Sequence, residues 1–159
     1  MSTLFLAFAL SLPHMHAVHA ERAPQAVEAA IAVANTQGCL VFRQLEDPEE
    51  RCVRTVRLLL VIALFESGWN PNPPSRPGAD NDHGEACGSM QVHKPNLVFG
   101  SCADARSSLF HSMREGHAFL TRLTQTCSSL ERALGAYATG LCGGAPKTTA
   151  WKCGLAGGC

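Results

Sequence analysis

One stretch decides the fold: residues 47–72, which read DPEERCVRTVRLLLVIALFESGWNPN. Asp47 can cap the amino terminus of a helix, and Pro48 suits the first helical position because its missing N–H would have no partner there. Apolar residues then recur every three or four positions, and Gly68 supplies a stop. The sequence therefore predicts a largely buried helix over residues 48–67.

Glu66 lies in the last turn of this helix, on the same face as Leu59, Ile62 and Ala63. Burial disfavours a charged carboxylate, and so does the partial negative charge at the carboxyl end of a helix. A carboxyl group that keeps its proton is what the general acid of a glycosidase requires. The alternative from periodicity alone is a glutamate that points to solvent from a frayed last turn.

The rest of the chain also predicts helices. The Ala-rich segment 24–35 begins with Pro24 and stops near Gly38, and helical patterns return at 104–123 and 129–138, the latter opened by Ser128. A loop rich in proline and acidic residues is expected from residue 69 to about 86. The predicted fold class is mainly α.

The first twenty residues, MSTLFLAFALSLPHMHAVHA, contain no Lys, Arg, Asp or Glu. Their apolar core is too short to span a bilayer, and the small-residue site at Val18–Ala20 is typical of signal-peptide cleavage. We predict a signal peptide over 1–20 and one mature domain over 21–159, in a secreted or periplasmic protein without a membrane span.

An even number of cysteines, eight, follows the predicted cut. In a small exported chain this predicts a disulfide framework, although the spacing does not choose among pairings. No pair has C-x-x-C spacing, so no metal or other cofactor is predicted. The cysteines are Cys39, Cys52, Cys87, Cys102, Cys127, Cys142, Cys153 and Cys159.

Three motifs in order along residues 48–141 resemble the lysozyme-like lytic transglycosylase family, specifically the soluble lytic transglycosylase type of catalytic domain. They are the Glu66-Ser67 pair, the Gly88-Ser89-Met90-Gln91 segment and the 136–140 segment AYATG. The resemblance implies a lysozyme-like helical domain with a cleft for the glycan strands of peptidoglycan. It also implies cleavage of the β-1,4 bond between N-acetylmuramic acid and N-acetylglucosamine, with a 1,6-anhydro product.

The resemblance makes Glu66 the single general acid/base, with Tyr137 near its carboxyl group. The residues that it assigns to substrate binding are Ser67, Ser89, Met90, Gln91 and Tyr137. The chain departs from the family at Ala138, where the motif carries an asparagine that can hydrogen-bond.

Two alternatives stay open. An inverting hydrolase would need a second carboxylate about 6.5–9.5 Å from the first, and Asp80, Asp82 and Glu85 of the acidic loop are the candidates. A secreted glycan-binding protein without turnover is the rival from another class, and a small disulfide-rich inhibitor leaves the motifs unexplained. Thirteen basic and thirteen acidic residues cancel, which argues against a nucleic-acid binder. Because wall-degrading enzymes are often basic, a neutral one could be placed by a secretion or conjugation apparatus.

Overall fold

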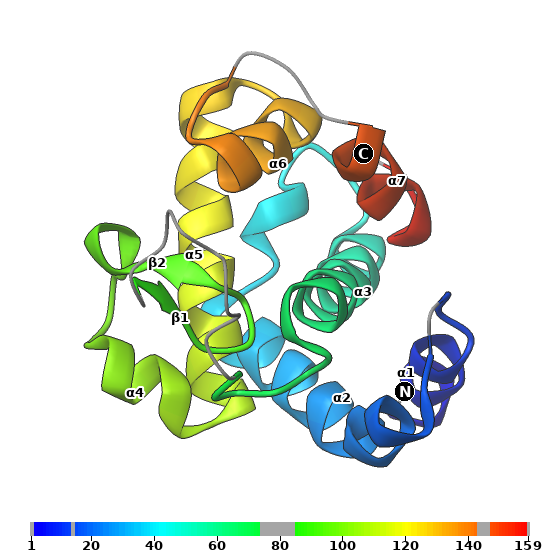
Figure 1. Cartoon of the computed structure of the whole chain (residues 1–159). Coiled ribbons are helices and arrows are strands. Elements are labelled where there is room, and N and C mark those ends of the chain that lie inside the picture. Colours follow the sequence, from blue (N-terminus) through cyan, green and yellow to red (C-terminus); the bar gives the residue numbers. More distant parts are fainter. Residues whose placement is uncertain (1, 14, 74–84, 143–146, 159) are drawn as a thin grey trace.

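The computed structural model describes residues 2–13, 15–73, 85–142 and 147–158, without the side chains of residues 147–150. Helices and one small antiparallel sheet make up this part of the chain (Figure 1). The predicted fold class, a mainly α, lysozyme-like domain braced by disulfides, is confirmed. In chain order the elements are α1 (Ser2–Leu10), α2 (Ala17–Gln37), η1 (Leu40–Phe42), α3 (Pro48–Ser67), β1 (Ala86–Cys87), β2 (Val92–His93), η2 (Lys94–Asn96), α4 (Cys102–Ser107), α5 (Leu109–Cys127), α6 (Leu130–Thr139) and α7 (Lys147–Leu155).

Helix α3 lies at the centre of the core and has the bounds that the sequence predicts. It packs against α1, α2, α5 and α7, and Figure 1 looks along its axis with α2 below it and α5 to its left. Every residue from Leu58 to Leu64 is buried. Since each buried aliphatic side chain contributes about 1.5–3 kcal/mol, this helix is a principal source of the folding free energy.

The end of α3 is held by two residues in left-handed conformations. Gly68 has φ of +62°, and its N–H donates to the Leu64 carbonyl at 2.7 Å. A side chain at Gly68 would also meet the imidazole of His19. Trp69 follows with φ of +56°, is fully buried, and donates its indole N–H to the Leu60 carbonyl at 2.9 Å. The last turn of α3 is therefore anchored rather than frayed.

The other helix boundaries differ in part from the prediction. Helix α2 begins at Ala17, so Pro24 lies inside it rather than at its first position. The predicted helix over 104–123 is two helices, because extended Ser108 (φ −160°) ends α4 and caps α5. Ser129, not Ser128, caps α6, since Ser128 adopts the left-handed conformation that terminates α5.

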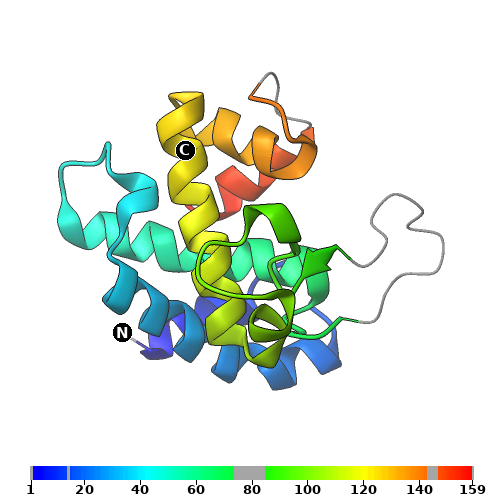
Figure 2. The same cartoon turned by 90° about the vertical axis from the view of Figure 1, so that its left-hand side faces the viewer.

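The sheet and α6 both pack against α5. Figure 2 shows α5 upright, with the two strands against one side and α6 near its upper end. The strands pair in antiparallel register, Ala86 with His93 and Cys87 with Val92, and the turn between them holds the Gly88–Gln91 motif. The sheet therefore holds that motif against α5.

The amino-terminal segment packs on the domain. Helix α1 contacts α2 and α3, with Phe5, Ala9 and Leu12 buried, and α2 runs without interruption through Ala20. Cleavage after Ala20 stays a prediction. No helix in the described part of the chain combines the length and apolarity needed to cross a bilayer.

Disulfides brace successive parts of the chain. The pairs are Cys39–Cys52, Cys87–Cys102 and Cys127–Cys142, with sequence separations of 13, 15 and 15. Cys153 is disulfide-bonded too, and none of the cysteines that the structure describes is free. Cys159 lies outside the described residues. The expected oxidised framework is confirmed for the seven described cysteines.

Candidate active site

Glu66 is half-buried at the carboxyl end of α3, with 29% of its side chain exposed. Its Oε1 accepts a hydrogen bond from Nζ of Lys152 on α7 at 2.6 Å. The Lys152 side chain is 17% exposed, so this ion pair is partly removed from water. Glu66 is therefore paired with the ammonium group of a residue that lies far from it in the sequence.

Ser67 completes the local geometry of the helix end. Its hydroxyl donates to the Ala63 carbonyl at 3.1 Å and accepts from the backbone N–H of Asn70 at 3.1 Å. These bonds satisfy backbone groups that the end of a helix would otherwise leave without partners. Ser67 thus fixes the backbone beside Glu66, and substrate contact by this residue stays a prediction.

The Gly88–Gln91 turn is rigid and internally bonded. Gly88 and Gln91 both have left-handed backbone conformations, with φ of +67° and +51°. The Gln91 side-chain amide donates to the Gly88 carbonyl at 2.7 Å. A half-buried Gln91 held in this way presents a fixed polar edge, which suits its predicted role in glycan binding.

Ser89 and Met90, by contrast, have no exposed surface. The Ser89 hydroxyl donates to Oγ of Ser112 on α5 at 3.0 Å, and the Met90 backbone N–H donates to the same oxygen at 2.9 Å. Ser112 is itself fully buried. The predicted sugar contact by Ser89 and Met90 remains a prediction, and their observed contacts anchor the turn to α5.

Tyr137 on α6 connects the turn to Glu66. Its hydroxyl donates to the Met90 carbonyl, and its ring packs against Phe119 with centroids 5.3 Å apart. Burial, and after it the negative charge of Glu66, raises the pKa of the Tyr137 phenol well above its ordinary value. Tyr137 therefore stays a neutral donor beside Glu66, which agrees with its predicted placement near that carboxyl group.

Only one of the three candidates for a second carboxylate lies in the part of the chain that the structure describes. Asp80 and Asp82 lie outside the described residues. Glu85 is described and exposed, and its backbone carbonyl accepts from the Lys94 N–H at 2.9 Å. Within the described residues no group of three or more His, Cys, Asp or Glu could hold a metal ion.

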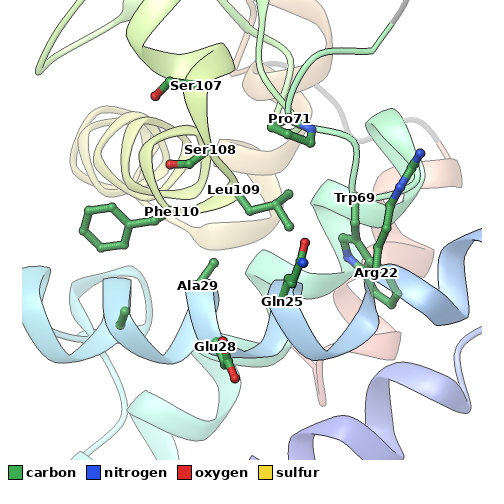
Figure 3. A pocket seen from close by; sticks show the side chains of 11 residues that line it. Arg22, Gln25, Glu28, Ala29, Trp69, Pro71, Ser107, Ser108, Leu109 and Phe110 are labelled. Atoms are coloured by element: carbon green, nitrogen blue, oxygen red, sulfur yellow. The ribbon is translucent and has the colours of Figure 1, made fainter.

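A separate groove of about 560 Å³ lies between α2 and the start of α5. Figure 3 shows Gln25 and Ala29 of α2 facing Leu109, with Trp69 at one end. None of the predicted catalytic or substrate-binding residues is among the described residues that line it. It is distinct from the Glu66 site.

Sequence reasoning missed two residues that the structure brings to the Glu66 site. Ser112 lies beneath the Gly88–Gln91 turn, and Lys152 touches the candidate acid. Neither carries a motif: Ser112 is an ordinary residue of an amphipathic helix, and Lys152 lies beyond the region of resemblance. Ser112 directly precedes Met113, which lies on the apolar face of the helix, so the pattern indicates only that Ser112 is near the core.

Comparison with protein families identifies the class. Residues 47–145 match the transglycosylase SLT domain, and this region contains Glu66, the Gly88–Gln91 turn and Tyr137. The chain therefore belongs to the transglycosylase SLT family, and the resemblance that its motifs suggest is confirmed. The family is one of peptidoglycan lytic transglycosylases. Comparisons with curated proteins and with solved structures gave no match.

Proposed function

We propose that the chain cleaves the β-1,4 bond between N-acetylmuramic acid and N-acetylglucosamine, with Glu66 as its single acid/base. The observation that carries this proposal is the placement of Glu66. Its half-buried carboxyl group ends a rigid core helix beside neutral Tyr137, which is bonded to the Gly88–Gln91 turn. All of these residues lie within the family match.

The reaction proceeds in two proton transfers. Protonated Glu66 gives its proton to the bridging oxygen as the bond from the muramic C1 to that oxygen breaks. The muramic 6-hydroxyl oxygen then bonds to C1, and its proton returns to the Glu66 carboxylate. The product is a 1,6-anhydro ring, Glu66 ends in its starting form, and no water is consumed.

Tyr137 and the turn supply orientation rather than a second acid. The neutral phenol next to Glu66 keeps its O–H as a donor, and it uses this donor to hold the Met90 carbonyl of the turn. Gln91, fixed by its bond to Gly88, offers its amide oxygen to sugar hydroxyls or acetamide groups. A preorganised site of this kind loses little entropy when it binds the reacting ring.

We also propose an extracytoplasmic location. The disulfides favour an oxidising compartment, and the proposed substrate is the cell wall. The chain has a formal net charge of zero, so attraction to an anionic wall does not place it. A secretion or conjugation apparatus is the class of partner that we propose for this task.

The test is mass spectrometry of peptidoglycan digested by the oxidised chain, by Glu66→Gln and by Glu49→Gln. Glu49, exposed at the opposite end of α3, provides a matched control for the substitution. We expect products one water lighter than reducing muropeptides from the wild type and Glu49→Gln, and none from Glu66→Gln. Thermal unfolding of Glu66→Gln should match the wild type, because the amide oxygen can still accept from Lys152.

Each other outcome has a stated meaning. Reducing products would contradict the transglycosylase reaction and favour hydrolysis with a loop carboxylate. Unchanged activity in Glu66→Gln would contradict the assignment of the acid. Binding to peptidoglycan without any cleavage would favour a glycan-binding protein.

A further inference from the structure

Helix α7 lies outside the family match, which ends at residue 145. It nevertheless packs against both α3 and α6, the two helices that carry Glu66 and Tyr137 (Figure 1). The candidate site is therefore bordered by a segment that the family pattern does not include. What this helix does to Glu66 follows from its contacts.

Two successive residues of α7 contact two successive residues of α3. Trp151 packs edge-on against Phe65 with ring centroids 4.3 Å apart, and Lys152 pairs with Glu66 at 2.6 Å. This repeated contact fixes the helix in both position and rotation. Lys152 is consequently aimed at Glu66 by packing, unlike a long surface side chain that must be ordered for a single exposed ion pair.

The end of the chain strengthens this attachment. Cys153 and Ala156 are buried in the hydrophobic core, and Gly157 lies beside Arg54 and Arg57 of α3. The contact with Glu66 is therefore a feature of the folded tail.

The charge of Lys152 opposes the first proton transfer of the proposed reaction. A general acid must carry a proton, whereas a neighbouring ammonium group stabilises the ionised carboxylate. The same contact occupies one carboxylate oxygen of Glu66. Lys152 from α7 pairs with Glu66, and Tyr137 from α6, whose pKa the charge of Glu66 helps to raise, stays neutral.

We propose that α7 is an autoinhibitory latch on Glu66. With the latch closed, Lys152 occupies one carboxylate oxygen of Glu66 and places a positive charge beside it. Cleavage requires Lys152 to leave that carboxyl group when the glycan strand binds. This inference rests on the proposed function, because it needs Glu66 to be the acid/base.

The test compares the oxidised full chain with Lys152→Met, Lys152→Arg and Glu66→Gln in peptidoglycan digestion across pH. Methionine keeps much of the apolar stem and removes the charge, whereas arginine keeps the charge. Lys94→Met, at an exposed lysine on η2, is the matched control. We expect Lys152→Met to digest faster by about two- to fivefold, the range set by the strength of partly exposed ion pairs.

The pH profile separates the latch from a purely structural effect. Removing the ammonium group removes the charge beside the proposed acid, so the pH profile of digestion by Lys152→Met should differ from that of the wild type. Lys152→Arg and Lys94→Met should keep the wild-type profile. A general loss of structure would lower activity without changing the pH profile.

The outcomes distinguish failure of the latch from failure of the proposed function on which it rests. Digestion by the wild type but not by Glu66→Gln, with no gain in rate and an unchanged pH profile in Lys152→Met, would overturn the latch and leave the proposed function standing. Absence of digestion by every variant and the wild type would overturn both. Activity in Lys152→Met alone would support both.

A second measurement needs no substitution. Amide hydrogen exchange of the wild type is followed with and without the β-1,4 tetramer of N-acetylglucosamine. We expect the α7 amides to exchange faster in its presence, because the bound glycan takes the place of Lys152 at Glu66 and displaces the helix. Protection of α7 that is unchanged or increased, with the tetramer bound, would overturn the latch.

Discussion

Replacing Gly116 with alanine tests the packing that holds the Gly88–Gln91 turn. Gly116 lies in α5 directly against the fully buried Met90 of that turn. A Cβ at this position would lie 2.4, 2.8 and 2.9 Å from the Cε, Cγ and Cβ atoms of Met90. Ordinary carbon contacts are about 3.5–4.0 Å, so the methionine must move as a whole.

Two opposing effects set the change in the free energy of unfolding that Gly116→Ala should cause. Alanine favours a helix interior over glycine by about 1 kcal/mol, which alone would stabilise the variant. Overpacking a filled core costs about 1–3 kcal/mol, and the close approach of Met90 Cβ, which cannot swing aside, places this site in the upper part of that range. We expect the free energy of unfolding to fall by about 1–2 kcal/mol as the net of these terms.

The assay is urea unfolding of the oxidised chain, with Gly154→Ala as the control. Gly154 lies in α7, and a Cβ there meets nothing within 4 Å, so this variant should be as stable as the wild type or slightly more stable. In a Met90→Ala background the strain should largely disappear, which a double-mutant cycle measures. A Gly116→Ala chain as stable as the wild type would refute the packing argument.

Two further predictions concern stability. Burial lowers the pKa of His117 to about 4, with a smaller opposing effect from its hydrogen bond to the Gly38 backbone. Between pH 6.5 and 4, His117 binds a proton in the unfolded chain but not in the folded one. The contribution of neutral His117 to the free energy of unfolding, roughly 2–3 kcal/mol, is therefore lost as the pH falls through that window. Urea unfolding at pH 7 and 4.5 should show a weaker pH dependence in His117→Leu, and an equal dependence would contradict this cause. Replacing Cys127 and Cys142 together by alanine opens a loop of 15 residues and should cost about 3 kcal/mol, whereas an unchanged melting temperature would count against the crosslink as a stabilising element.

Local patterns in the sequence determined α3 and the place of Glu66 on it. The signals for α3 are local: a capping residue, a proline at the first helical position, the apolar spacing and a terminal glycine. They can therefore be interpreted without knowledge of the fold. The order of the Glu66, Gly88–Gln91 and Tyr137 motifs was likewise sufficient to indicate the family. Helix ends were harder to predict: Ser128 and Ser129 are both able to cap, but Ser128 takes the left-handed conformation that ends α5, and Ser129 caps α6.

Only the tertiary structure decided that Lys152 pairs with Glu66 and that Tyr137 bonds to the Met90 carbonyl. Lys152 is separated from it by 86 residues, and Tyr137 from Met90 by 47. Contacts over such separations depend on how whole helices pack, and no local rule of spacing encodes them. The sequence by itself thus supplied the candidate acid, its family and, through the resemblance, Tyr137 near that acid, whereas the fold supplied the buried Ser112 anchor and the ammonium group that pairs with Glu66.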